Sequence, residues 1–276
     1  MMKYAFCNEP FKDLPFEETC RILAEIGYDG VELAPFTFAE DVREMDAAAR
    51  TKIRKTAEDA GLEVAGIHWL LISPKGFHLT TEDEKVREAT FEFLVSLQEF
   101  CRDVGGKVLI HGSPVQRNLE EGQDRKLVEE RTLDIFRRLG ESAEKIGVIH
   151  CLEPLDSGQT NFIQTPADGF EWVQSVDRPG FQMMLDARAS FEENLEPGDE
   201  LKKFHSAIKH VHLNDKNLLG PGMGDCEFEP LFRAGQEIGF DRFYSVEPFD
   251  YSPGAEVIAQ KSFETISKLH KKVFGE

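Results

Sequence analysis

No apolar run in the sequence approaches the roughly 18 residues that a membrane-spanning helix requires. The first residues, 1–7, also lack the apolar core and the small-residue cleavage site of a secretory signal. We therefore expect no membrane partner, and a cytoplasmic location is the default expectation.

Cysteines are few and far apart. Their number is odd and no Cys-X-X-Cys pair occurs, which argues against a disulfide framework or a cysteine zinc knuckle. We expect Cys7 and Cys151, which lie in apolar runs, to be small buried side chains. The five cysteines are Cys7, Cys20, Cys101, Cys151 and Cys226.

Basic residues are scarce. The chain has 32 Lys and Arg against 51 Asp and Glu, a net charge of -19 at pH 7. Such a charge repels phosphate backbones, and nucleic-acid-binding proteins usually carry a basic patch, which this sequence lacks. Nucleic acid and anionic membranes are therefore not expected as partners.

Linkers are also lacking. The 276 residues contain no Gly/Ser/Pro-rich segment, no low-complexity tract and no shift in composition. The length suits a single α/β barrel, which needs about 250 residues. We predict one domain that covers residues 1–276.

The sequence does contain a regular alternation of short apolar runs and longer helical segments. Most of the short runs are apolar almost throughout, as in parallel strands that are buried on both faces. The predicted strands are Lys3–Asn8, Gly30–Ala34, Glu63–Trp69, Lys107–His111, Val148–Glu153, Phe181–Asp186, Lys209–Leu213 and Phe243–Glu247.

Helices are predicted between these strands. One opens with a capping box from Thr81 to Glu84, and another opens with the pair Thr165-Pro166. Eight strand–helix pairs predict the α/β class and a (β/α)8 TIM barrel. A doubly wound open sheet competes, but no Gly-X-Gly-X-X-Gly motif follows the first strand. The predicted helices are Phe16–Gly27, Asp46–Ala60, Thr81–Val104, Asp124–Ile146, Thr165–Ser175, Gly198–Ala207, Glu229–Ile238 and Gly254–Phe274.

In such a barrel the catalytic residues lie at the carboxyl ends of the strands. The last four predicted strands each end with a residue type that binds metals, namely Glu153, Asp186, His212 and Glu247. Buried carboxylates need compensation, which a shared divalent cation supplies. We predict that these four side chains bind one metal ion. The alternative is a hydrogen-bonded polar ring that closes the barrel.

Three carboxylates and one imidazole suit Mn²⁺, Mg²⁺ or Co²⁺ better than a structural Zn²⁺, although Zn²⁺ stays an option. His210 points the same way as His212 but is expected to lie deeper, because it precedes His212 by two residues on the same strand. Glu32, on the second strand, is expected to support the site from behind or to be structural.

The strand-end motifs resemble those of the xylose isomerase-like family of sugar isomerases and epimerases, which are TIM barrels. In the ketose 3-epimerases of this family, two glutamates bind the metal and flank the substrate. The resemblance implies that Glu153 and Glu247 remove and return the proton next to the carbonyl, through a metal-stabilised enediolate. The motifs are Leu152-Glu153-Pro154-Leu155, Leu185-Asp186, His210-Val211-His212 and Val246-Glu247-Pro248.

Further residues are candidates for holding the substrate. His68 and His111 could donate hydrogen bonds, stabilise the enediolate or bind a second metal together with Glu153, and the alternative is that they are core histidines. Trp69 could form a wall against a sugar face. Arg117 could bind a carboxylate or phosphate, although a surface charge fits it equally well.

The chain departs from the ketose 3-epimerases where those enzymes hold the substrate. Gln159 stands where they have Glu, Ala189 stands where they have His, and Leu218 lies in the loop where they have Arg. A site without those groups holds a small free ketose weakly. We therefore expect a phosphorylated, oxidised or glycosylated sugar as the substrate, with Gln159 among its contacts.

The predicted function is a metal-dependent isomerase or epimerase of a sugar or sugar derivative. The alternatives are a lyase or dehydratase with the same proton abstraction, a metal phosphoesterase similar to the apurinic endonucleases of this fold, and a non-catalytic sugar-binding barrel. The third-metal histidines of those endonucleases lack counterparts, since Ala189 fills one position. A homo-oligomer is compatible with the sequence, but nothing in the sequence specifies one.

Overall fold

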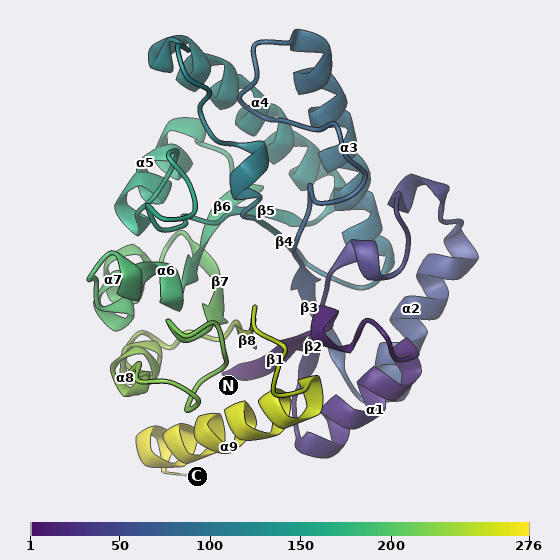
Figure 1. The fold of residues 1–276 in the computed structure, drawn as a ribbon, viewed down its shortest axis with the longest axis vertical. Coiled ribbons are helices and arrows are strands. Elements are labelled where there is room, and N and C mark those ends of the chain that lie inside the picture. The colour runs from purple at the N-terminus through teal and green to yellow at the C-terminus, as the bar shows by residue number, and fades with distance from the viewer. Residues whose placement is uncertain (1, 276) are drawn as a thin grey trace.

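Eight parallel strands close into a barrel, in which each strand pairs with the next along the chain and β8 pairs with β1 (Figure 1). The computed structural model describes residues 2–275. The predicted TIM barrel is confirmed, and closure of the sheet rules out the open-sheet alternative. The strands are β1 (Lys3–Cys7), β2 (Gly30–Leu33), β3 (Glu63–Ile67), β4 (Val108–His111), β5 (Ile149–Leu152), β6 (Phe181–Asp186), β7 (Ile208–Leu213) and β8 (Phe243–Val246).

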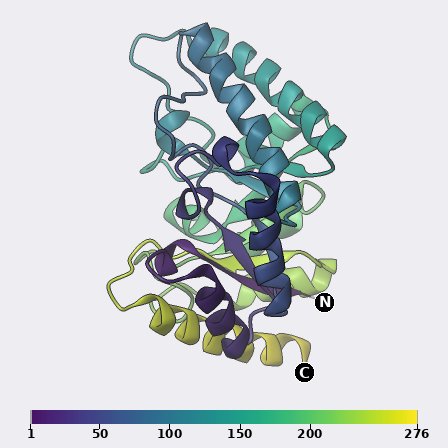
Figure 2. The ribbon, with the colours of Figure 1, turned by 90° about the vertical axis from the view of Figure 1, so that its right-hand side faces the viewer.

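Helices surround the strands on the outside of the barrel (Figures 1 and 2). Every predicted helix is present, and a further short helix, α6, directly follows β6. The helices are α1 (Phe16–Ile26), α2 (Ala47–Asp59), α3 (Glu84–Asp103), α4 (Arg125–Ile146), α5 (Pro166–Val176), α6 (Ala187–Glu192), α7 (Pro197–Phe204), α8 (Glu229–Ile238) and α9 (Ala255–Phe274). Short 3-10 helices lie in the loops: η1 (Glu9–Phe11), η2 (Pro35–Thr37), η3 (Val42–Glu44) and η4 (Pro114–Gln116).

One of the two predicted motifs at helix N-termini is correct. Thr165 forms a reciprocal capping box with Asp168 at the start of α5. The predicted box from Thr81 is wrong, because α3 begins three residues later. Asp83 caps that helix instead, and its carboxylate accepts hydrogen bonds from the backbone N–H groups of Lys85 and Val86.

The barrel has two apolar cores. A small cluster inside the barrel contains Val108, Ile110, Cys151 and Met184, and a much larger one fills the space between strands and helices. Side chains of β4 therefore alternate, since Val108 and Ile110 belong to the inner cluster and Leu109 to the outer one. This alternation decides which side chains at the strand ends reach the barrel mouth.

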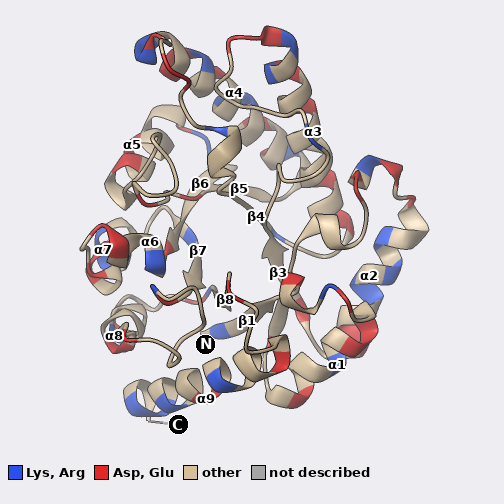
Figure 3. Ribbon diagram, in the orientation of Figure 1, with Lys and Arg blue, Asp and Glu red and all other residues tan. Residues whose placement is uncertain are grey.

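The remaining composition-based expectations concern thiols and charge. Cys7 and Cys151 are buried as predicted, and all five thiols are free. Basic and acidic residues are interspersed along the outer helices (Figure 3). No helix among residues 2–275 has both the length and the apolar character needed to cross a membrane.

Candidate metal centre

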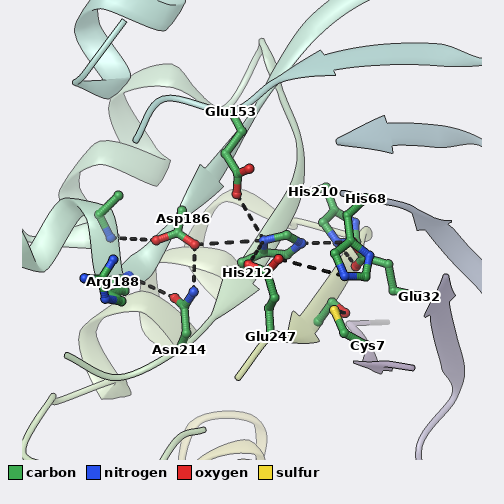
Figure 4. Close-up of polar contacts among 12 residues, drawn as sticks. Cys7, Glu32, His68, Glu153, Asp186, Arg188, His210, His212, Asn214 and Glu247 are labelled. Carbon is green, nitrogen blue, oxygen red and sulfur yellow. Dashed lines mark hydrogen bonds and ion pairs between the residues drawn. The ribbon is translucent and has the colours of Figure 1, made fainter. Parts of the chain in front are cut away.

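The four predicted metal ligands lie together in the barrel mouth (Figure 4). His212 Nδ1 lies 2.9 Å from Glu247 Oε2, 3.1 Å from Glu153 Oε1 and 3.9 Å from Asp186 Oδ2. All four side chains are buried. Ligand atoms about 3 Å apart fit a coordination sphere with metal–ligand distances of about 2.1 Å, so the arrangement suits a divalent cation.

The sheet fixes where the two glutamates stand. The backbone N–H of Glu153 donates to the carbonyl of His111 on β4, and the backbone N–H of Glu247 donates to the carbonyl of Leu213 on β7. The next residue in each case is a proline, which has no N–H to continue the ladder. Each glutamate is therefore the last residue of its strand whose backbone N–H is hydrogen-bonded to the neighbouring strand. Its side chain points into the barrel mouth.

The carboxylate of Glu153 packs closely against Gly112. A Cβ atom on Gly112 would lie 2.1 Å from Glu153 Oε2, so only glycine leaves room for this carboxylate. Gly112 directly follows β4, the strand that pairs with β5. The sequence of β4 therefore contributes to the position of a ligand on β5.

Asp186 is held by hydrogen bonds to both of its carboxylate oxygens. Oδ1 accepts from the backbone N–H of Ala189 at 2.6 Å, so Asp186 also caps α6. Oδ2 accepts from Asn214 Nδ2 at 2.8 Å. Asn214 was not predicted as a site residue, although it follows His212 by two residues at the end of β7.

Burial and neighbouring carboxylates raise the pKa values of Glu247 and Asp186. Burial raises the pKa of Glu247 to about 7, and burial together with Glu153 raises the pKa of Asp186 to about 6. Burial opposes a charge on His212, but Glu247 and Glu32 hold the pKa of its ring well above the usual value. A site that attracts protons in this way also attracts a divalent cation in their place.

Glu32 lies on the side of His212 that faces away from Glu153, close to the rings of three histidines (Figure 4). Its Oε1 lies 3.0 Å from His212 Nε2 and 3.3 Å from His68 Nδ1, and its Oε2 lies 2.7 Å from His210 Nε2. Glu32 therefore contacts a ligand candidate without being one itself, as expected. His210 lies beside Glu32 and not among the four ligand candidates. Carboxylates that bind the far nitrogen of a metal-ligating histidine orient its ring.

Among the predicted substrate contacts, His68 lies next to the metal centre. Its Nε2 is 3.0 Å from Glu9 Oε2 and 3.9 Å from Glu247 Oε1. Burial by itself lowers the pKa of His68, but Glu9 and Glu32 raise it to about 9. Glu9 was missed in the sequence, although it follows β1 at the same edge of the barrel.

Trp69 follows His68 and stands between two other aromatic rings. Its ring meets Phe36 and Phe249 edge-on, with centroids 6.4 and 6.1 Å apart. The backbone of Trp69 has a φ of 55°, which is unusual for a bulky residue. Its Nε1 is buried and has no hydrogen-bond partner among residues 2–275.

His111 lies on the wrong side of the barrel wall for a substrate contact. Its Nδ1 is 2.9 Å from His150 Nε2, and its ring meets Phe136 of α4 edge-on. Because Val108 and Ile110 point inward on β4, His111 points outward, toward the helices. The core-histidine alternative describes this residue, and a second metal held by His68, His111 and Glu153 has no support in this geometry.

Arg117 is fully buried, which its predicted contact with a substrate carboxylate or phosphate does not allow. Its guanidinium donates to the carbonyl oxygens of Glu153 (2.7 Å), His111 (3.2 Å) and Ile163 (3.3 Å). Burial lowers the pKa of Arg117 to about 10, so the group stays charged at neutral pH. The guanidinium ties the ends of β4 and β5 together beneath Glu153.

Gln159 belongs to a polar cluster in the loop after β5. Asp156 Oδ2 accepts from Gln159 Nε2 at 2.5 Å and from Arg188 Nη1 at 3.1 Å. Arg188 follows Asp186 by two residues and was missed, although a cation so close to a predicted ligand is a signal that the sequence contains. Its backbone N–H donates to Asn214, the residue that also holds Asp186.

The chain is similar to known proteins in sequence and in fold. A family model described as xylose isomerase-like TIM barrel matches residues 20–269. The chain is 26% identical over 229 residues to a probable ketose 3-epimerase of Synechocystis sp., covering 82% of this chain and 75% of that protein. It is 25% identical to a 3-dehydro-D-guloside 4-epimerase of Escherichia coli, covering 97% of this chain and 99% of that protein.

A solved structure shares the whole fold. The crystal structure of a D-psicose 3-epimerase, determined in the presence of D-fructose, superposes with a TM-score of 0.84. The match covers 100% of both chains at 20% sequence identity.

Proposed function

Since the chain belongs to the xylose isomerase-like TIM-barrel family, we propose that it is a metal-dependent epimerase or isomerase of a sugar or sugar derivative. The observation that carries this proposal is the position of two carboxylates. Glu153 from the end of β5 and Glu247 from the end of β8 approach His212 Nδ1 from different sides (Figure 4). A substrate held between them would have a carboxylate on each face.

The chemistry needs one group to remove a proton and another to return it. A C–H next to a carbonyl is a weak acid, and a positioned carboxylate base accelerates its removal by about 10²–10⁴-fold. Glu153 and Glu247 are the candidates, one for each face of the substrate. Burial raises the pKa of Glu247 to about 7 in the metal-free protein, and a bound cation would lower it, so that the carboxylate would be free to act as a base.

Glu153, Asp186, His212 and Glu247 would hold the divalent cation. When bound, the cation would neutralise the negative charge that develops on the substrate oxygens as the proton leaves. Asp186 would serve as a ligand only, since both of its oxygens are already held by hydrogen bonds. We propose Mn²⁺, Mg²⁺ or Co²⁺ as the ion, with Zn²⁺ as a further option.

For the substrate we propose a keto sugar that carries a substituent. Gln159 is already bonded to Asp156, and Ala189 presents only a methyl group, so neither offers charge to a small free ketose. Leu218 is exposed and apolar. The relative matched over nearly its whole length acts, by its name, on a guloside, which is a sugar with a glycosidic substituent.

Three of the predicted substrate contacts remain in the proposal, and Arg188 is added to them. Trp69 would pack against a sugar face and donate from Nε1, His68 would face the reacting carbons beside Glu247, and Gln159 with its neighbour Arg188 would meet the distal substituent. A cytoplasmic location stays a prediction, and a homo-oligomer stays compatible with the sequence.

The proposal is tested with a panel of free ketoses, ketose phosphates and keto-glycosides, incubated with protein loaded with Mn²⁺. We expect an epimer or isomer to accumulate, with higher kcat/KM for the substituted sugars and no reaction after chelation. Products that have lost water or the substituent would instead support the lyase alternative. A metal-free preparation with full activity would contradict the proposal.

A further inference from the structure

Glu247 presents its two carboxylate oxygens to two different clusters. Oε2 lies 2.9 Å from His212 Nδ1, within the candidate metal centre, whereas Oε1 lies 3.9 Å from His68 Nε2. We propose that Glu9, His68 and Glu247 form a second divalent-cation site that shares Glu247 with the first. This inference rests on the proposed function, because the shared carboxylate belongs to the proposed metal centre.

The second cluster has the same kind of geometry as the first. His68 Nε2 lies 3.0 Å from Glu9 Oε2, and one ligand atom of each of the three residues lies within 4.8 Å of the others. The residues follow β1, β3 and β8 at the mouth of the barrel, and all three are buried. Two carboxylates and one imidazole suit Mn²⁺, Co²⁺ or Zn²⁺, and three protein ligands leave positions open for substrate oxygens or water.

The His68 ring directs Nε2 into the proposed site. Nε2 lies 3.0 Å from Glu9 Oε2 and 3.9 Å from Glu247 Oε1, whereas Nδ1 lies 3.3 Å from Glu32 Oε1 without a hydrogen bond to it. The same Glu32 oxygen lies 3.0 Å from His212 Nε2. One carboxylate therefore lies next to the far nitrogen of both histidines, which is the place that outer-shell carboxylates take in metal sites.

Glu9 supplies an independent observation. Its side chain is only 2% exposed, yet Oε1 has no hydrogen-bond partner in the described part of the chain, residues 2–275. A buried carboxylate oxygen without a partner carries a large desolvation cost, which a cation would remove. Five carboxylates are buried around the two clusters, namely Glu9, Glu32, Glu153, Asp186 and Glu247.

This site is distinct from the second-metal site expected from the sequence. That expectation placed His68 and His111 around Glu153, but His111 points outward to His150. The proposed site lies on the β1–β3 side of the mouth and uses the other glutamate. Trp69, which follows His68, would place a sugar face beside it.

Titration of chelator-treated protein with Mn²⁺ tests the proposal, with stoichiometry read by calorimetry and by metal analysis after desalting. We expect two Mn²⁺ per chain in the wild type and magnetic coupling between them in the electron paramagnetic resonance spectrum. Glu9→Gln should retain one Mn²⁺ with its affinity changed by less than about 3-fold and should lose the coupling. Glu17→Gln, an exposed matched control on α1, should behave as the wild type.

His68→Gln provides a second variant, and melting curves without metal show whether each variant is folded. A wild type that binds a single Mn²⁺, lost in Asp186→Asn, would overturn the second site and leave the proposed metal centre standing. Two uncoupled Mn²⁺, or two Mn²⁺ in folded Glu9→Gln and His68→Gln, would also overturn it. A wild type that binds no Mn²⁺ would contradict the proposed function as well.

Discussion

Glu32 Oε1 lies 3.0 Å from His212 Nε2, on the edge of the ring that faces away from Glu153 and Glu247. Burial by itself raises the pKa of Glu32, but His212, His210 and His68 hold it well below the usual value, so Glu32 stays ionised. An ionised carboxylate only accepts hydrogen bonds, so Glu32 holds a proton on His212 Nε2, and a metal would take the place of the proton on Nδ1.

Glu32→Gln should therefore weaken metal binding without removing a ligand. The amide can donate as well as accept, so it no longer fixes which nitrogen of His212 carries the proton. We expect the Kd for Mn²⁺ at the first site to rise about 10–100-fold, measured by titration of chelator-treated protein. Glu17→Gln serves as the exposed control, and an unchanged Kd in Glu32→Gln would show that the contact does not support the ligand.

The four ligands should respond differently to substitution. Asp186→Asn should mainly weaken metal binding, so excess Mn²⁺ should restore part of the turnover. Glu153→Gln and Glu247→Gln should stay at least about 10²-fold slower in kcat at saturating metal, because each also loses a base. If excess metal restored the full kcat of either glutamine variant, that glutamate would be a metal ligand and not a base.

Gly112→Ala tests how Glu153 is held. The added Cβ would lie 2.1 Å from Glu153 Oε2 and would force the carboxylate to turn away. We expect at least about a 10-fold weaker Mn²⁺ affinity, since displaced ligands lose the geometry of the site. Ser113→Ala, at the next residue, is the control, and wild-type affinity in Gly112→Ala would contradict the tight fit.

The buried pair His111–His150 should make the protein sensitive to acid. Burial lowers the pKa of His150 to about 3, whereas an unfolded chain takes up the proton near pH 6.5. The unfolded state therefore binds more protons below pH 6.5, and the free energy of unfolding falls as the pH falls from there toward 3. At pH 5 this single group costs about 2 kcal/mol relative to neutral pH.

His150→Gln should reduce that loss. The measurement is the change in the free energy of unfolding between pH 7 and pH 5, from urea titrations of chelator-treated protein. We expect the change to be smaller in His150→Gln than in the wild type by about 2 kcal/mol, and unaltered in His205→Gln, an exposed control. Equal pH dependence in wild type and His150→Gln would contradict the assignment.

The sequence predicted the barrel and the four ligand candidates because both depend on local patterns. Each strand is a short apolar run, and Glu153, Asp186, His212 and Glu247 stand where those runs stop. Ends of parallel strands in a closed barrel meet at one mouth, so the ligands converge without any knowledge of distances.

The prediction for His111 failed because its strand gave no sign of which way each side chain points. Val108, Leu109 and Ile110 are all apolar and buried, so no alternation separates the inner face from the outer one. Arg117 was misplaced for a different reason. Its carbonyl partners include Glu153 and Ile163, far along the chain, so its burial depends on tertiary contacts.

The contacts around Glu32 could not be predicted from the sequence, because, like the burial of Arg117, they depend on tertiary contacts. Glu32 on β2 meets His68 after β3 and His210 and His212 on β7, and these contacts cross the barrel interior. Strand patterns do not specify which inward side chains meet across a barrel. Glu9 could have been noticed as another carboxylate at a strand end, but its partners could not.

The central claim is that Glu153 and Glu247 exchange protons with opposite faces of one carbon. The most direct test is solvent deuterium incorporation in D2O, at saturating Mn²⁺, starting from each epimer of the best substrate in turn. The wild type should incorporate deuterium into the epimer formed from either starting sugar. Glu153→Gln and Glu247→Gln should both stop epimerising, but each should still exchange deuterium into one epimer, and the two variants should exchange opposite epimers. Exchange into the same epimer by both variants would contradict the account.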